Sequence, residues 1–212
     1  MNYKMKKYRF LAVISAALIA TVPLSSCSGI QASVTVPNAS SSVTYQAAVA
    51  LPETSGSNTE KVEFYFPRAG QKVEPQLLSV INSSQKTLDI AIYSLTNSKI
   101  GSAITHAHRR GVAVRLITDR EQASGQYQKS LLKGLVKAGI PVKIDTHSGL
   151  MHLKVTIADG KIATTGSYNY TKSAEETNDE VFVVLRDEKA AHDFDAEFGK
   201  MWNDTKNFKN FK

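Results

Sequence analysis

A histidine and a lysine two positions apart are the first residues of this sequence whose types and spacing could do chemistry. His152 and Lys154 lie in the apolar stretch 151–166, which alternates like a strand and contains an Asp-Gly pair typical of a β-hairpin turn. Side chains at positions i and i+2 of a strand point to the same face. We therefore expect His152 and Lys154 to share one face, while the apolar residues between and beside them pack on the other.

Two further pairs with the same spacing follow along the chain. Ser167 and Asn169 come directly after the hairpin, and Asn178 and Glu180 begin the next apolar stretch. Three adjacent strand segments would bring an imidazole, a fixed cation, neutral hydrogen-bonding groups and an acid to one patch. Such a set suits a phosphoryl group, whose developing negative charge is stabilised by preorganised donors. Since only one carboxylate and one imidazole converge, we expect no metal and no other cofactor at this patch.

The complete spacing carries a family resemblance. His152-x-Lys154, four residues, Asp159, six residues and then Gly166-Ser167-x-Asn169 resembles the HKD motif of the phospholipase D superfamily with its GSxN extension. The resemblance extends over about residues 61–205, and its specific part is 151–180. We therefore interpret the chain as a phospholipase D-like domain with one motif per chain.

The resemblance implies a role for each site residue. His152 would attack phosphorus and form a phosphohistidine intermediate. Lys154, Ser167 and Asn169 would hold the phosphate oxygens. Glu180, thirteen residues after Ser167, matches the family acid that hydrogen-bonds the histidine and fixes its tautomer.

Other polar residues near the motif are interpreted as structural. Asp159 and Gly166 belong to the motif, but we expect both to support structure, since Asp159 sits at the hairpin turn. Asn178 is assigned to structure, and His147 to an exposed loop that leads into the site. The basic cluster at 106–110 is interpreted as a solvated helix end.

The mechanism of the superfamily uses two HKD motifs, one histidine attacking and the other protonating the leaving oxygen. This chain carries one, because the other histidines have no matching lysine, Gly-Ser or Asn around them. An isologous interface sets each strand beside its own copy on a two-fold axis. We therefore expect a homodimer with one composite site, whose two copies of His152 titrate as a coupled pair.

The elements that must position these residues follow from periodicity. We expect an α/β fold with a mixed, mostly parallel sheet flanked by helices on both faces. Strands are predicted at 61–67, 87–95, 112–119, 141–146 and 178–186, together with the hairpin within 151–170; helices are predicted at 75–84, 99–111, 127–139 and 187–204.

The first 60 residues are assigned to export and tethering. Residues 1–27 have a basic start, an apolar run from 10 to 22 and small residues up to Cys27, which indicates a signal peptide. The order Leu24-Ser25-Ser26-Cys27 resembles a lipoprotein signal, in which the cysteine is lipidated; ordinary cleavage near Ser26 is the alternative. Residues 28–60 lack strand or helix periodicity and predict a flexible tether before a catalytic domain at 61–212. We expect location in the bacterial periplasm or cell envelope.

Charge and composition limit the choice of substrate only weakly. Without the four basic residues of the leader, 22 basic and 19 acidic residues remain, so the formal charge falls from +7 to +3. Any basic surface must therefore be local. A nuclease needs a basic rim around His152, from residues such as Lys172, Arg120 or Lys129, whereas a lipase needs an exposed apolar collar, and no such run is evident in the adjacent loops.

The favoured interpretation is a metal-independent, non-specific endonuclease that cuts DNA, with RNA as a further substrate. In length and in the segment "GSYNYTKSAEETNDE" the chain resembles small exported bacterial nucleases with a single motif. The alternative is a phospholipase D that acts on membrane phospholipids beside a lipid anchor. The mitochondrial single-motif phosphodiesterases of animals are also similar, but this chain lacks their Cys/His-rich insert. An envelope-tethered DNA-binding protein without catalysis is disfavoured, because every catalytic motif position is present.

Overall fold

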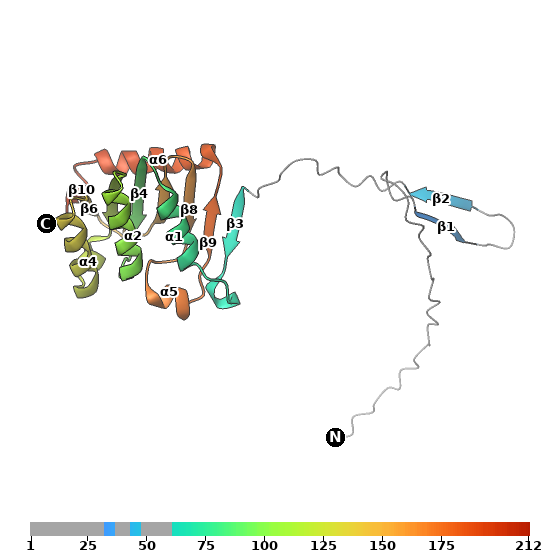
Figure 1. The fold of residues 1–212 in the computed structure, drawn as a ribbon, viewed down its shortest axis with the longest axis horizontal. Coiled ribbons are helices and arrows are strands. Elements are labelled where there is room, and N and C mark those ends of the chain that lie inside the picture. The colour runs from blue at the N-terminus through green and yellow to red at the C-terminus, as the bar shows by residue number, and fades with distance from the viewer. Residues whose placement is uncertain (1–31, 37–42, 48–60) are drawn as a thin grey trace, which may run out of the picture. The chain divides into compact units, whose positions relative to one another are not determined.

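The computed structural model describes residues 32–36, 43–47 and 61–212 of the chain, which falls into two compact units, Met1–Gly56 and Ser57–Lys212 (Figure 1). In the first unit, strands β1 (Ala32–Val36) and β2 (Val43–Ala47) pair antiparallel. These two strands lie within 28–60, where no periodicity indicated them, and their β-branched residues favour strands. The tether role of 28–60 stays a prediction. The predicted signal peptide and Cys27 lie outside the described residues and stay predictions.

The second unit alternates strands and helices along most of its length. In chain order its elements are β3 (Val62–Tyr65), the 3-10 turn η1 (Pro67–Ala69), α1 (Glu74–Ser83), β4 (Thr87–Ile92), α2 (Ser98–Arg109), β5 (Ala113–Thr118), α3 (Arg120–Ser124), α4 (Gln126–Lys137), β6 (Val142–Asp145), β7 (Lys154–Ala158), β8 (Ile162–Gly166), α5 (Lys172–Glu176), β9 (Phe182–Leu185), α6 (Glu188–Asn203) and β10 (Phe208–Asn210). Within the described residues, no helix is long and apolar enough to cross a membrane.

One eight-stranded sheet organises this unit, in the order β10-β6-β5-β4-β7-β8-β9-β3. The prediction of a mixed sheet flanked by helices is confirmed, but the expectation of a mostly parallel sheet is wrong. Among the strands of this sheet, only β4–β5 and β5–β6 pair in parallel. The turn at Asp159–Gly160 joins β7 to β8 and is too short for the helical crossover that a parallel pair needs, so these two strands pair antiparallel.

Helices cover both faces of the sheet (Figure 1). Apolar residues of α1, α2 and α4 pack against one face, where the core includes Leu77, Ile104 and Leu132. Helix α6 covers the other face through Ala191 and Phe198, which cluster with buried residues of β4, β5, β7 and β8. Because alternate residues of a strand face opposite layers, both surfaces of the central strands are buried.

The polar strand ends meet at one edge of this sheet. Strand β4 is antiparallel to β7, with Ile92 opposite Lys154, so the carboxyl end of β4 lies beside the amino end of β7. Strand β8 then returns to the same edge and ends opposite the start of β9, with Gly166 beside Phe182. Every motif residue except Asp159 therefore lies at or near this edge, at or just outside the ends of the strands.

Candidate active site

An aromatic ring joins the histidine and the lysine of the motif. Tyr93 follows β4, and its ring centroid lies 4.6 Å from that of His152. The ammonium nitrogen of Lys154 lies 4.8 Å from the same ring centroid and donates a 2.9 Å hydrogen bond to the backbone carbonyl of His152. The structure thus brings His152 and Lys154 together, although His152 precedes β7 and only Lys154 belongs to the strand.

Lys154 is a buried cation without an ion-pair partner. Lys154 is only 5% exposed, and no described carboxylate lies within ion-pair distance of its ammonium group. Burial lowers the pKa of Lys154 from its ordinary value, and the charge of Glu180 opposes that shift. A buried charge is costly unless an opposite charge approaches, so this position favours binding of an anion.

Ser167, Asn178 and Glu180 form a second cluster at the same edge of the sheet. The Ser167 hydroxyl donates to Oε2 of Glu180, and Asn178 Nδ2 donates to Oε1 of Glu180 at 3.0 Å. The backbone N–H of Val181 donates to Ser167 Oγ at 3.1 Å. Within the part of the chain that the structure describes, no hydrogen bond joins Glu180 to His152, so the orienting role expected for this acid stays a prediction.

Gly166 makes the close approach of β8 and β9 possible. Its φ of 129° lies in a region that favours glycine, and a Cβ there would stand 2.1 Å from the carbonyl oxygen of Val181. Without a side chain, the next residue reaches Val181 directly, with a backbone hydrogen bond of 3.0 Å from Ser167 N to that same carbonyl. Gly166 thereby fixes the position of Ser167 against β9.

Two buried tyrosines hold the segment that follows Ser167. The hydroxyl of Tyr170 lies 2.6 Å from Oγ1 of Thr156, and burial raises the pKa of Tyr170 to about 12. The hydroxyl of Tyr168 donates to Glu175 at 2.9 Å. Asn169 lies between these anchors, and its Oδ1 is buried without a described hydrogen-bond partner. The segment is thus rigid, while part of the hydrogen-bonding capacity of the Asn169 amide is unused.

Asp159 lies at the hairpin turn, away from the edge that carries the other motif residues. Its φ of 56° is the only positive value of a non-glycine residue within the described chain. Its carboxylate accepts from the backbone N–H groups of Gln85, Lys86 and Thr87, at 2.7 to 3.2 Å. Although burial raises the pKa of Asp159, these bonds outweigh that effect and lower it. Asp159 fastens the start of β4 to the hairpin.

A hollow lies beside Ser167 and Glu180, and exposed apolar residues flank His152 in the sequence. A hollow of about 630 Å³ lies beside Ser167 and Glu180 and is bordered by Phe66. On either side of His152, Leu150 is 51% exposed and Leu153 is 42% exposed. The exposure of Leu153 was not predicted, because the alternation of the strand places Leu153 on the buried face.

The residues suggested for a basic rim are divided between two places. Lys172 forms an exposed ion pair with Glu176, in which Nζ lies 3.6 Å from Oε2. Arg120 and Lys129 border a different hollow, of about 350 Å³, together with the C-terminal Lys212. They therefore do not form one continuous rim.

Tyr93 is the contact residue that sequence reasoning missed. As an aromatic residue ending a buried apolar strand, it was counted as part of that strand. Its hydroxyl accepts a 3.1 Å hydrogen bond from Gln122 Nε2, and its backbone N–H donates to the carbonyl of Leu153 at 2.8 Å. The signal that could have found it is its position at the carboxyl end of a central strand, where α/β sheets place their sites.

The remaining histidines and the acidic residues form no second site in the described chain. His147 contacts the ring of Phe208 at a centroid distance of 5.6 Å, and His192 lies beside Gly160 at the opposite end of the hairpin. No group of three or more His, Cys, Asp or Glu among the described residues is arranged to hold a metal ion.

Comparison with known families gives one match over most of the folded unit. Residues 77–202, more than half of the chain, match the family described as "Cardiolipin synthase, PLD-like domain". The chain is 36% identical over 128 residues to the mitochondrial cardiolipin hydrolase of Chlamydomonas reinhardtii, which is 60% of this chain and 56% of that protein. The chain thus spans about half the length of the curated relatives it matches.

Two solved structures share the fold. The phospholipase D family member Nuc from Salmonella typhimurium has 29% sequence identity and a TM-score of 0.66, over 71% of this chain and 97% of that chain. NucT from Helicobacter pylori has 28% identity and a TM-score of 0.59, over 67% of this chain and 95% of that chain.

Proposed function

Because this chain belongs to the phospholipase D superfamily, we propose that it is a metal-independent phosphodiesterase, an endonuclease of DNA and RNA. The single observation that carries the chemistry is the buried Lys154, which has no described carboxylate partner and lies beside the exposed His152. A phosphodiester supplies the missing negative charge at that point. The similarity to Nuc and NucT over nearly their whole length supports a nucleic acid as its source.

The proposed reaction proceeds in two balanced steps. In the first step a neutral His152 attacks phosphorus, the N–P bond forms and the P–O bond to the leaving sugar breaks. The leaving oxygen takes a proton from a second, protonated imidazole. In the second step water attacks phosphorus and gives a proton to that imidazole; the new P–O bond forms, the N–P bond breaks, and the phosphate ester leaves with His152 restored to its neutral form. Lys154, Ser167 and Asn169 donate to the non-bridging oxygens throughout.

We propose that the second imidazole is His152 of another copy of the chain. No other histidine of the described residues lies near the site, whereas His152 is exposed at the sheet edge and can face its own copy. A homodimer with a two-fold axis beside His152 completes one composite site. In that dimer Glu180 of either chain is available to orient the histidine of the other.

The test of catalysis uses the purified chain in EDTA, with the His152→Ala variant as its control. Plasmid DNA, single-stranded RNA and vesicles containing cardiolipin are offered in parallel, and cleavage of each is quantified. We expect cleavage of nucleic acid by the wild-type chain that persists in EDTA, and at least a thousandfold loss in the variant. A chain that leaves both nucleic acids intact refutes the proposal.

The test of the composite site mixes wild-type chain with His152→Ala chain under conditions that allow subunits to exchange. If one site needs both histidines, activity follows the square of the wild-type fraction, so an equal mixture of subunits retains about a quarter of the activity. Independent monomers would retain half, and that linear result would contradict the dimeric site.

A second candidate function is hydrolysis of membrane phospholipids. The specific observation in its favour is the exposure of Leu150 and Leu153 on either side of His152, which could contact acyl chains. The similarity to mitochondrial cardiolipin hydrolases supports the same candidate. Turnover of the vesicles with intact nucleic acid, and its loss in a Leu150→Ser/Leu153→Ser variant, would favour the phospholipase over the nuclease.

A further inference from the structure

The charges of this chain are divided unevenly along the folded unit. Residues 98–143 contain nine lysines and arginines and only two acidic residues, whereas residues 144–212 contain nine basic and twelve acidic residues. Helices α2, α3 and α4 all belong to the first segment, and α5 and α6 to the second. Arg115 and Lys143 of the first segment contact aromatic rings of α6, on the other face of the sheet. Helices α2 and α4 themselves contain five lysines and arginines and no acidic residue, an excess that the net charge of the whole chain conceals.

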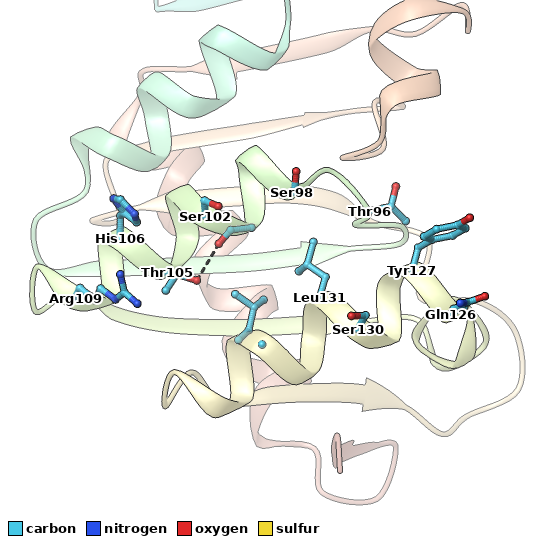
Figure 2. Close-up of a pocket in the computed structure, with 13 residues that line it drawn as sticks. Thr96, Ser98, Ser102, Thr105, His106, Arg109, Gln126, Tyr127, Ser130 and Leu131 are labelled. Carbon is cyan, nitrogen blue, oxygen red and sulfur yellow. Dashed lines mark hydrogen bonds between the residues drawn. The ribbon is translucent and has the colours of Figure 1, made fainter.

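A groove of about 590 Å³ runs between α2 and α4 (Figure 2). Thr96, Gln126 and Tyr127 lie at one end of it, and His106 and Arg109 lie at the other (Figure 2). Between these ends the lining is rich in hydroxyl side chains, which are Ser98, Ser102, Thr105 and Ser130. Hydroxyl and cationic groups together are the usual partners of phosphate and sugar oxygens.

The groove begins beside the candidate active site. The backbone N–H groups of Thr96 and Asn97 both donate to the carbonyl of Tyr170 at 3.0 Å, so the end of the groove adjoins the segment that carries Ser167. The buried side chain of Gln128 accepts from Leu95 N at 2.7 Å and fixes the first turn of α4 to the same place.

An exposed aromatic ring lies at this end of the groove. Tyr127 is 78% exposed, more than any other large hydrophobic residue of the described chain, and it is adjacent to the anchored Gln128. An exposed ring on a fixed backbone offers a surface on which a base can stack. Because Tyr127 lies at the end of the groove nearer the site, its ring could stack with a base close to the scissile phosphate.

The cations at the other end of the groove have no partners among the described carboxylates. Arg109, Lys133 and Lys137 are exposed, and none of them forms an ion pair. Lys133 and Lys137 do not line the groove themselves; each follows a lining residue, Ser130 or Gly134, by three positions, which places them beside that row at the margin of the groove. On α6, by contrast, exposed lysines lie 2.9 Å from acidic residues.

We propose that the groove between α2 and α4 binds a single nucleic-acid strand that extends away from the active site. Arg109, Lys133 and Lys137 contact its phosphates, and one base stacks on Tyr127. The twelve residues of α2 span ~18 Å at 1.5 Å per residue, which is long enough for a few phosphates of an extended strand. A duplex is too wide to enter a groove between two packed helices. This inference rests on the proposed nuclease function and adds the form of its substrate.

The first test measures binding rather than cleavage. The variant Lys133→Glu/Lys137→Glu is made in the His152→Ala background, and fluorescence anisotropy follows a labelled 20-nucleotide strand over a range of salt concentrations. The matched control is Lys189→Glu/Lys200→Glu, which makes the same charge change on α6. We expect Kd to rise at least tenfold and the slope of log Kd against log salt to fall by about 1.4, since each phosphate contact contributes about 0.7. The control should change Kd less than threefold.

The second test measures cleavage in chains that retain His152. With bis(p-nitrophenyl) phosphate, which reaches only the active site, the α4 variant should keep kcat/KM within twofold of the wild-type value. With a long single strand, its KM should rise at least tenfold. Tyr127→Ala should weaken strand binding about tenfold by loss of base stacking.

Several results would overturn the inference. An equal loss of strand binding in the α4 variant and the α6 control would show general charge attraction, and unchanged binding would show that the groove is not used. Loss of binding to cardiolipin vesicles with intact strand binding would assign the basic layer to a membrane surface. If the wild-type chain cleaves no nucleic acid but strand binding depends on Lys133 and Lys137, the nuclease proposal fails while this one stands.

Discussion

Replacing Tyr93 tests whether its ring holds the catalytic pair. The ring face lies 4.8 Å from the ammonium group of Lys154, and its centroid lies 4.6 Å from that of His152. A cation–π contact with a desolvated cation is worth about 2 kcal/mol. Lys154 is buried, so this upper value applies. If the contact is needed in the transition state, Tyr93→Leu should lower kcat about 30-fold.

A matched variant separates the ring from its hydroxyl group. Tyr93→Phe keeps the aromatic face and loses only the oxygen that accepts from Gln122. Since one such hydrogen bond contributes about 1 kcal/mol, mostly to stability, kcat should stay within about threefold of the wild-type value. The assay is hydrolysis of bis(p-nitrophenyl) phosphate under saturating substrate, with thermal unfolding followed on the same samples.

Two results would refute this reasoning. If Tyr93→Leu retains kcat within threefold, the ring does not position the pair. If Tyr93→Phe loses as much activity as Tyr93→Leu, the hydroxyl group rather than the ring is responsible. A fall in kcat that disappears after correction for unfolded protein would likewise assign Tyr93 to folding alone.

Three further predictions concern residues of the motif. Asp159→Asn should lower the free energy of unfolding by about 1–2 kcal/mol at pH 7. Because the folded pKa of Asp159 is lowered, its stabilisation is present above the unfolded pKa and lost as pH falls through the folded one; urea titrations below pH ~4 should therefore show a smaller difference. Gly166→Ala should cost at least about 3 kcal/mol, seen as a large fall in Tm, since the added Cβ meets Val181 at 2.1 Å; an unchanged Tm would contradict the contact. If Lys154 must be charged, kcat should fall as pH rises through a value below 10.5, and Lys154→Arg should remove that alkaline limb; identical profiles would exclude Lys154 as its source.

Local patterns predicted the parts of the fold and site that depend on neighbouring residues. The amphipathic spacing of α1, α2, α4 and α6 located each helix to within about two residues. The two-residue period of the hairpin predicted that Lys154 and Val155 face opposite sides of the sheet, and Val155 packs in the layer of α6. A hairpin turn fixes the register of its two strands. The turn therefore also predicted that Ser167, after β8, lies at the same edge of the sheet as His152, before β7.

Features that depend on distant residues could not be predicted in this way. Sheet order and direction follow from tertiary packing, so the excess of antiparallel pairs was missed. Helices α3 and α5 have five residues each and β10 has three, which is too short for a periodic signal. The contact of Tyr93 with His152 joins residues 59 positions apart, and no residue spacing within either segment predicts it. The exposure of Leu150 depends on where its loop lies, which alternation does not address.

The Ser167 hydroxyl has a single hydrogen, and in the free chain that hydrogen is committed to Glu180. Its oxygen is engaged as well, by the backbone N–H of Val181. If Ser167 donates to a substrate phosphate as proposed, the hydrogen has to swing from the carboxylate to the incoming oxygen. Glu180 then keeps Asn178 as a donor and gains a vacant lone pair. Arrival of the substrate would thus release the acid for an imidazole, so that the orienting contact absent from the free chain forms only when there is something to cleave.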